Sequence, residues 1–330
     1  MKFPNRPRWV PKRKPKTVFV FSGGAVRGAA QIGMLKVLSE AGIKPDEIVG
    51  VSIGALNGFW FACDPTLDRI KELERLWLDI VEDPPISGNV LRRVTSILRG
   101  KPSFDTGEKL KSFLQENIPS TDLSKTEIPF HLGTTSASTG LINWWDEGPS
   151  VDLLLASAAL PGLLPAVQLN DDDYHLDGGV VSNIPLRKAV SLKPTRVIVL
   201  DVATRFLPPE KQTAISLMMI GFRAASAELS RQEWADVPKN VKVIHIGLQD
   251  PDGDLDIDFQ NVPNLMKEGE KVARKVLSES LTNVESAVAS PVFDSSGKEI
   301  IGAIYGSRSS TCPGDRFCRR YWPGTRTKRN

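Results

Sequence analysis

The chain has few of the residues that build disulfide frameworks and metal sites. Its 330 residues include only three cysteines and three histidines. Three cysteines do not make a disulfide framework, and their spacing with the histidines matches no zinc-binding pattern. This scarcity argues against a disulfide-stabilised or zinc-binding protein, and we expect neither a metal nor a cofactor.

Long apolar runs are also missing. The basic N-terminus, MKFPNRPRWVPKRKPK, is not followed by an apolar segment, so it does not match a secretory signal. The longest apolar stretch, VDLLLASAALPGLLPAV at 151–167, contains Asp152, Pro161 and Pro165, which would interrupt a membrane-spanning helix. We therefore expect a cytoplasmic protein, with peripheral contact to a membrane left open.

The basic residues are concentrated at the two ends of the chain. Residues 1–16 carry seven Lys/Arg and no acid, and residues 301–330 carry seven Lys/Arg and one acid. The remaining 28 basic and 38 acidic residues give the body a net charge of −10. Such tails are typically solvated, and they would also attract an anionic membrane surface. No aromatic platform or helix-turn-helix accompanies them, so we expect no specific nucleic-acid binding. The oligomeric state stays open.

Segments typical of strands and of helices alternate from Thr17 onward. We expect strands at 17–21, 47–51, 128–137, 140–146, 173–179, 195–202 and 241–247, and helices at 29–42, 53–63, 66–81, 106–117, 151–160, 210–235 and 262–281. This alternation predicts an α/β domain over 17–285, with a mostly parallel sheet covered on both faces. A basic tail, 1–16, precedes it, and a C-terminal extension, 286–330, ends in the second basic tail.

One serine lies in the turn between an expected strand and an expected helix. The segment EIVGVSIGALNGFWFA (47–62) places Ser52 between Gly50 and Gly54. G-x-S-x-G at such a turn is typical of a nucleophile elbow, where a strained backbone exposes the serine hydroxyl. The following helix directs its N-terminal dipole toward developing negative charge. Ser52 is therefore the candidate nucleophile.

A second glycine-rich turn, GGAVRG at Gly23–Gly28, also follows a strand and precedes a helix. Its backbone N–H groups could hold an anion. The spacing of its glycines matches neither the dinucleotide fingerprint nor the P-loop. The oxyanion of an acyl-transfer intermediate is the better candidate for that anion.

Two residues could act as the base for Ser52. Asp177 stands at a strand end before Gly178 and Gly179, where a carboxylate can point into a site. Ser52, Asp177 and His245 also follow the chain order of an α/β-hydrolase triad. However, His245 lies in the apolar run VKVIHIG, where a histidine is more commonly packed within the strand.

Together these motifs resemble the patatin-like phospholipase family. GGAVRG, GVSIG and DGG occur in the order of that family. SAALPGLLPAV (157–167) and DGGVVSNIPL (177–186) resemble the segments before and after its catalytic aspartate, and DFQNVPNLMKEGEKVARKVL (258–277) resembles its closing helix. The resemblance covers about residues 17–280 and is strongest to the bacterial single-domain members.

The resemblance implies a three-layer α/β/α fold and a serine lipid acyl hydrolase that works through an acyl-enzyme. Ser52 matches the nucleophile and Asp177 the base, without a catalytic histidine. The residues that match the oxyanion loop are Gly23, Gly24, Ala25 and Arg27. The motif glycines are Gly28, Gly50, Gly54, Gly178 and Gly179. The family commonly has glycine where this chain has Ala25, which would be strained if the position requires φ > 0.

Several alternatives stay open at this point. The protein could be a Ser52–Asp177–His245 triad esterase, a transacylase, or a catalytically weak lipid- or anion-binding protein. The ester could be a phospholipid, a lysophospholipid, a monoacylglycerol or a short-chain ester. Candidate pocket-wall or core residues are Phe59, Trp60, Trp144, Trp145 and the segment 160–167.

For two further segments the sequence gives only weak indications of function. Segment 82–104 combines apolar and basic residues, as an amphipathic lid or a plain surface helix would. The acidic loop 249–258 does not match an EF-hand, because Leu255 and Asn261 occupy the positions of its glycine and glutamate.

Overall fold

The computed structural model describes residues 15–85, 105–203, 214–248 and 259–282, all within one compact unit, Met1–Val288. Most of the predicted lid segment 82–104 lies outside the described residues. The acidic loop 249–258, residues 1–14 of the N-terminal tail and the extension 286–330 lie wholly outside them.

Eight strands in the described residues form one mixed sheet. They are β1 (Thr17–Phe21), β2 (Glu47–Val51), β3 (Phe130–Ser136), β4 (Ile142–Trp145), β5 (Val167–Gln168), β6 (Tyr174–Asp177), β7 (Arg196–Asp201) and β8 (Lys242–Gly247). The order across the sheet is β5-β6-β3-β2-β1-β7-β8, and β4 also pairs with β3. Strands β3, β2, β1, β7 and β8 pair with one another in parallel, in this order. Strands β4 and β6 pair antiparallel with β3, and β5 pairs antiparallel with β6. Only the two-residue strand β5 is not among the predicted strands.

The helices follow the predicted segments closely, except for the short helix α7 (Leu186–Ser191), which is not among the predicted helices. They are α1 (Ala29–Glu40), α2 (Ile53–Cys63), α3 (Leu67–Glu82), α5 (Glu108–Asn117), α6 (Ser150–Ser157), α7 (Leu186–Ser191), α8 (Ala214–Ala235) and α9 (Val262–Thr282), with short 3₁₀ turns η1 (Ala25–Gly28), η2 (Leu123–Lys125), η3 (Gly178–Val180) and η4 (Phe259–Asn261). In the part of the chain that is described, no helix has the length and hydropathy needed to cross a bilayer.

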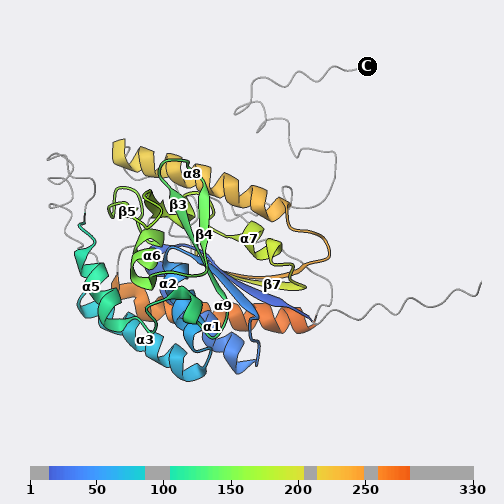
Figure 1. Cartoon of the computed structure of the whole chain (residues 1–330). Coiled ribbons are helices and arrows are strands. Elements are labelled where there is room, and N and C mark those ends of the chain that lie inside the picture. The colour runs from blue at the N-terminus through green and yellow to red at the C-terminus, as the bar shows by residue number, and fades with distance from the viewer. Residues whose placement is uncertain (1–14, 86–104, 204–213, 249–258, 283–330) are drawn as a thin grey trace, which may run out of the picture. The chain divides into compact units, whose positions relative to one another are not determined.

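The sheet separates two apolar cores, because side chains alternate across each strand. Phe19 and Phe21 of β1 pack into the larger core with α1, α2, α3 and α9. Val18 and Val20 point to the other face, into a smaller core under α7. Figure 1 shows α7 and α8 on one side of the sheet and α1, α3 and α9 on the other. The prediction of a three-layer α/β/α fold with a mostly parallel sheet is therefore confirmed.

The carboxyl ends of β1, β2 and β7 meet at one edge of the sheet, where ligands commonly bind in open α/β sheets. Strand β6 runs antiparallel to β3 and brings Asp177 opposite Thr134, one residue beyond the pair of Val51 with Gly133. The ends of β2 and β6 therefore approach each other across a single intervening strand.

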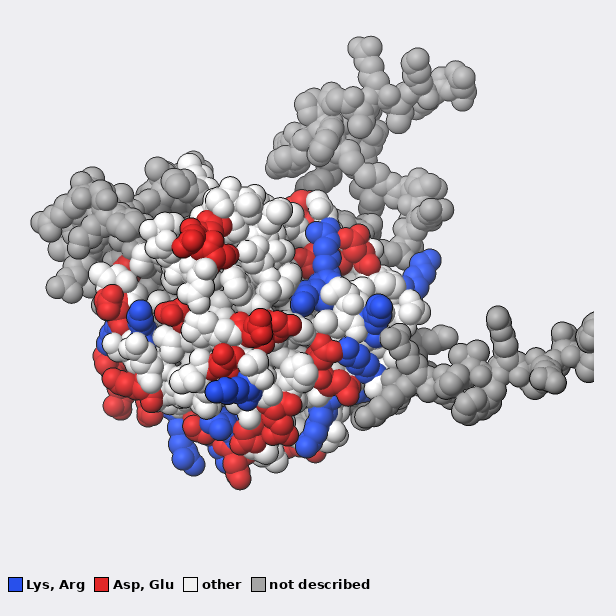
Figure 2. All heavy atoms as spheres, viewed as in Figure 1, with Lys and Arg blue, Asp and Glu red and all other residues white. Residues whose placement is uncertain are grey.

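Charged side chains of both signs are mixed over the lower helices in Figure 2. Two ion pairs join α1 to α9, one between Lys36 and Glu270 at 2.7 Å and one between Glu40 and Arg274 at 2.8 Å. The described residues on this face do not gather into a single basic patch.

Candidate active site

Ser52 occupies a strained turn between β2 and α2. Its backbone φ is 55° and its ψ −135°, a conformation that residues other than glycine rarely adopt. The turn is tight because Gly54 has no side chain: a Cβ there would lie 2.5 Å from the carbonyl oxygens of Phe21 and Ser22. The residue stands at the N-terminus of α2, as the G-x-S-x-G pattern predicts.

A buried serine from α6 supports this turn. The Ser52 N–H donates to the Ser157 Oγ at 3.0 Å, and that hydroxyl donates to the Gly133 carbonyl at 2.7 Å. Ser157 is completely buried. It therefore ties the elbow to β3. Ser157 begins the SAALPGLLPAV segment. It lies far from Ser52 in the sequence, so no local pattern predicts that it supports the turn.

The structure brings Asp177 to Ser52. The Asp177 side chain accepts hydrogen bonds from the Ser52 hydroxyl and, at 2.7 Å, from the Gly179 N–H. Asp177 is 2% exposed. Burial raises the pKa of Asp177 to about 7, although the two hydrogen bonds oppose that shift. The carboxyl therefore changes its charge near neutral pH.

A glycine in the Asp177 loop lets this loop approach β3 closely. A Cβ on Gly178 would lie 2.3 Å from the Gly133 carbonyl oxygen and 2.9 Å from a methyl group of Val51. The Thr135 hydroxyl donates to the Asp177 carbonyl at 2.9 Å, and the Asp177 N–H donates to Ala159 at 3.0 Å. The loop therefore crosses β3 closely enough to reach β2.

The glycine-rich loop 23–28 lies beside the elbow. A Cβ on Gly23 would lie 3.0 Å from the Ser52 Cβ, and one on Gly28 would lie 2.3 Å from the side chain of Ile53. The Gly23 N–H already donates to the Asn183 carbonyl at 3.2 Å. The first N–H groups of a helix have no intrahelical acceptor, and η1 begins at Ala25. The Gly24 and Ala25 amides are therefore the better placed anion donors.

Arg27 is buried beneath this loop, at 1% exposure. Its Nε donates to the Val202 carbonyl at 3.1 Å. That carbonyl is also in close contact with the loop, because a Cβ on Gly24 would lie 2.4 Å from its oxygen. The loop and the end of β7 are therefore held together at their backbones.

Two buried polar side chains, one from α1 and one from α2, hold the loop. Gln31 donates to the Ser22 carbonyl at 3.0 Å, and Asn57 donates to the Gly28 carbonyl at 2.9 Å. Asn57 also donates to Gln31 at 2.8 Å and accepts from Trp77 at 3.0 Å. Sequence reasoning missed these residues. Asn57, an isolated amide in the otherwise apolar helix α2, is the signal that could have identified one of them.

Ala25 has a φ of 50°, so the residue that departs from the family pattern lies in the left-handed region. That region costs a residue with a Cβ about 1–2 kcal/mol, whereas glycine adopts it freely. We expect Ala25→Gly to raise the free energy of unfolding by about 0.5–1 kcal/mol, after the entropic cost of glycine is subtracted. Urea unfolding would measure the change.

Ala29→Gly is the matched control, because Ala29 has right-handed helical angles, φ −55° and ψ −32°. Glycine there should lower the free energy of unfolding by about 1 kcal/mol. A loss of stability in Ala25→Gly as large as in the control would show that the left-handed conformation carries no strain.

His245 does not reach Ser52. Its Nε2 lies 2.9 Å from an Asp201 oxygen, and its ring meets Trp234 edge-on at 5.1 Å. Strand β8 is separated from β2 by β1 and β7, which corresponds to about 14 Å at the usual strand spacing. His245 instead binds the carboxylate at the end of β7.

Some pocket-wall candidates belong to the core. Phe59 and Trp60 are buried in the larger core, with ring centroids 6.0 Å apart. Trp144 and Trp145 of β4 are half-buried. Phe59 and Trp60 therefore stabilise the fold from within.

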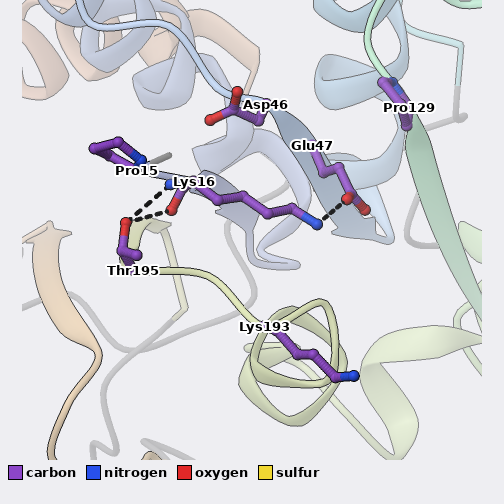
Figure 3. Close-up of a pocket in the computed structure, with 7 residues that line it drawn as sticks. All are labelled: Pro15, Lys16, Asp46, Glu47, Pro129, Lys193 and Thr195. Atoms are coloured by element: carbon purple, nitrogen blue, oxygen red, sulfur yellow. Dashed lines mark hydrogen bonds and ion pairs between the residues drawn. The ribbon is translucent and has the colours of Figure 1, made fainter. Parts of the chain in front are cut away.

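A separate hollow lies at the opposite edge of the sheet, at the amino ends of β1, β2 and β7 (Figure 3). It is lined by Pro15, Lys16, Asp46, Glu47, Pro129, Lys193 and Thr195. The Lys16 ammonium pairs with Glu47 and donates to the Leu192 carbonyl at 2.9 Å. Glu47 also pairs with His131 at 2.8 Å. These groups satisfy one another and secure the start of β1, so this hollow is not part of the Ser52 site.

The model of one protein family, described as Patatin-like phospholipase, matches residues 19–190. This range includes the elbow, the glycine-rich loop and the Asp177 loop. The chain belongs to the patatin-like phospholipase family.

Curated relatives align over the same part of the chain. Patatin-like phospholipase domain-containing protein 7 of Rattus norvegicus is 28% identical over 188 residues, which are 56% of this chain and 13% of that protein. Lysophospholipase nte1 of Aspergillus terreus is 28% identical over 189 residues, 56% of this chain and 12% of that protein. The chain therefore spans only a small part of the length of these relatives.

Solved structures with a similar arrangement include VipD from Legionella pneumophila, with a TM-score of 0.44 and 12% identity, covering 81% of this chain and 67% of that one. The ExoU–SpcU complex of Pseudomonas aeruginosa gives a TM-score of 0.40 and 14% identity, covering 82% of this chain and 53% of the matched chain.

Proposed function

We propose that this protein is a serine lipid acyl hydrolase in which Ser52 and Asp177 act as a catalytic dyad through an acyl-enzyme. The observation that carries this proposal is the hydrogen bond between the Ser52 hydroxyl, held on a strained turn, and a buried carboxyl whose pKa is about 7. A general base works best with a pKa near the pH at which it operates.

Asp177 takes the proton of Ser52 as the Ser52 Oγ attacks the carbonyl carbon of the ester. The resulting tetrahedral oxyanion accepts hydrogen bonds from the Gly24 and Ala25 amides, and the buried charge of Arg27 adds a favourable field. One donor of this kind typically contributes about 10²–10³ in rate. Asp177 then returns the proton to the leaving alkoxide, and the alcohol departs.

Water completes the reaction. It gives a proton to Asp177 while its oxygen attacks the acyl-enzyme carbonyl, and the same amides hold the second oxyanion. The intermediate collapses, the proton returns to the Ser52 oxygen, and the fatty acid is released. One carboxyl thus serves as base and acid in both halves of the reaction.

The substrate is a lipid ester. Family membership and the lysophospholipase among the relatives support this class. In this proposal residues 17–285 form the catalytic domain. The basic tail 1–16 and the basic end of the extension 286–330 contact anionic membrane surfaces through their charge. Neither a metal nor a cofactor takes part in this mechanism.

The first test is hydrolysis of p-nitrophenyl esters of graded chain length and of phospholipid vesicles by the purified chain. Wild type should turn over, and Ser52→Ala should fall to background while remaining folded by circular dichroism. The chain-length profile would then begin to define the acyl pocket. A wild type that is silent on both substrates would contradict the hydrolase and favour an anion- or lipid-binding protein.

His245→Gln separates a dyad from a triad. Glutamine keeps a side-chain donor for Asp201 but cannot serve as a catalytic base. We expect kcat/KM to stay within about threefold of wild type, since the histidine pairs with Asp201 rather than Asp177. A fall to the level of Ser52→Ala in a folded protein would establish the triad instead.

A further inference from the structure

The buried side chains in the described part of α8 are polar. Of the α8 side chains that the structure describes, the buried ones are Ser226, Ser230 and Glu233. Their spacing of four and three residues places them on one face of the helix. A helix that covers a sheet ordinarily buries an apolar stripe. This part of α8 therefore presents hydrogen-bonding groups to the domain where apolar contacts would be expected.

The first of these groups binds the loop that carries Asp177. The Ser226 hydroxyl donates to the Gly179 carbonyl at 3.0 Å. The N–H of the same glycine donates to the Asp177 carboxylate at 2.7 Å. Gly179 has no side chain of its own to hold it in place. Ser226 thus binds the carbonyl of the same residue whose N–H binds the Asp177 side chain.

Glu233 binds the far end of the same loop. It accepts from the Ser182 hydroxyl at 2.5 Å and from the Arg187 N–H at 2.8 Å. The side chain is buried, and this burial raises the pKa of Glu233 against the effect of these donors. A buried carboxyl is costly unless such donors satisfy it. Here the two donors satisfy the carboxyl, which in turn ties Ser182 and Arg187 to α8.

The two contacts enclose the segment that joins both halves of the site. Between them lies Asn183, whose carbonyl accepts the Gly23 N–H of the glycine-rich loop at 3.2 Å. A Cβ on Gly23 would lie 2.4 Å from the Asn183 side-chain oxygen, so the two loops are in direct contact. Fixing residues 179–187 thus also fixes the glycine-rich loop relative to Asp177.

We propose that Ser226 and Glu233 of α8 are positioning residues that hold the Asp177 loop in its reactive geometry. This inference rests on the proposed function of the dyad. Helix α8 lies beyond the segment 19–190 that the family model matches, so this support comes from outside the matched region. Misplacing a catalytic group by about 1 Å can cost about 10²-fold in rate.

The test compares Ser226→Ala with Ser226→Thr, which keeps the hydroxyl. Ser230→Ala is the matched control: Ser230 is nearly as buried, one turn along α8, and makes no hydrogen bond to the Asp177 loop among the described residues. Alanine favours helix, so these variants should fold. We expect Ser226→Ala to lower kcat about tenfold with KM within about twofold, Ser226→Thr to restore most of kcat, and Ser230→Ala to match wild type.

Hydrogen exchange of the peptide spanning residues 178–183 gives a second readout that needs no activity. It should exchange about fivefold faster in Ser226→Ala and in Glu233→Gln, and at the wild-type rate in Ser230→Ala. An unchanged kcat together with unchanged exchange would overturn the inference while leaving the hydrolase intact. If the wild type itself is inactive, the hydrolase fails and exchange alone decides whether α8 holds the loop.

Discussion

Asp177→Asn should lower kcat/KM by about 10²–10⁴-fold and, at alkaline pH, raise the stability of the fold. The loss of activity is expected because asparagine cannot take the proton of Ser52. The gain in stability is expected because the wild type must bury a charge at this position once Asp177 ionises. One substitution therefore moves activity and stability in opposite directions.

The size of the stability effect follows from the pKa of Asp177. Its value of about 7 in the folded protein stands against 3.8 for an ordinary aspartate. Each pKa unit corresponds to about 1.4 kcal/mol, so ionising Asp177 costs the folded state about 4 kcal/mol.

The sign of the pH dependence is fixed by linkage. The pKa of Asp177 is higher in the folded than in the unfolded protein, so protonated Asp177 favours the folded state. The wild type therefore has its full stability below about pH 4 and loses the contribution of Asp177 as the pH rises to about 7. Urea unfolding of wild type and Asp177→Asn should therefore nearly coincide near pH 4, diverge between about pH 4 and 7, and differ by a constant amount above.

Asp201→Asn is the matched control for this experiment. Burial raises the pKa of Asp201, but the hydrogen bond and charge of His245 outweigh it, and the pKa lies below its usual range. Removing this carboxylate should therefore destabilise the protein at about pH 8, where Asp177→Asn stabilises it. If both substitutions destabilise equally, burial of Asp177 carries no electrostatic cost and the raised pKa is wrong.

The activity of the wild type should depend steeply on pH below neutrality. Only the ionised form of Asp177 can act as the base, so kcat/KM should fall about tenfold for each pH unit below about pH 7. Between about pH 7 and pH 5 the loss should approach about 10²-fold. Initial rates on a soluble short-chain ester would measure this profile without the complication of a lipid surface.

Protonation of Asp177 favours the folded state. The loss of kcat/KM at acid pH is therefore not expected to arise from unfolding caused by this residue. Circular dichroism at each pH would verify that the protein stays folded. A flat profile down to about pH 5 would mean that a group with an ordinary carboxyl pKa, and not the buried Asp177, takes the proton.

The sequence by itself determined the local features of the site. The tight turn at Ser52 requires glycine at Gly54, where a Cβ would meet backbone oxygens at 2.5 Å. A turn of this kind depends on a few consecutive residues, so the G-x-S-x-G pattern between an apolar strand and a helix predicts it. The strand and helix order follows from periodicities that are equally local.

Only the tertiary structure decided how these features act together. The hydrogen bond between Ser52 and Asp177 depends on β6 pairing with β3 and on the close approach to Gly133 that Gly178 allows. The raised pKa of Asp177 depends on how completely the folded chain removes water from one carboxyl. Long-range pairing and desolvation are properties of the packed domain, and no short segment of the sequence contains them.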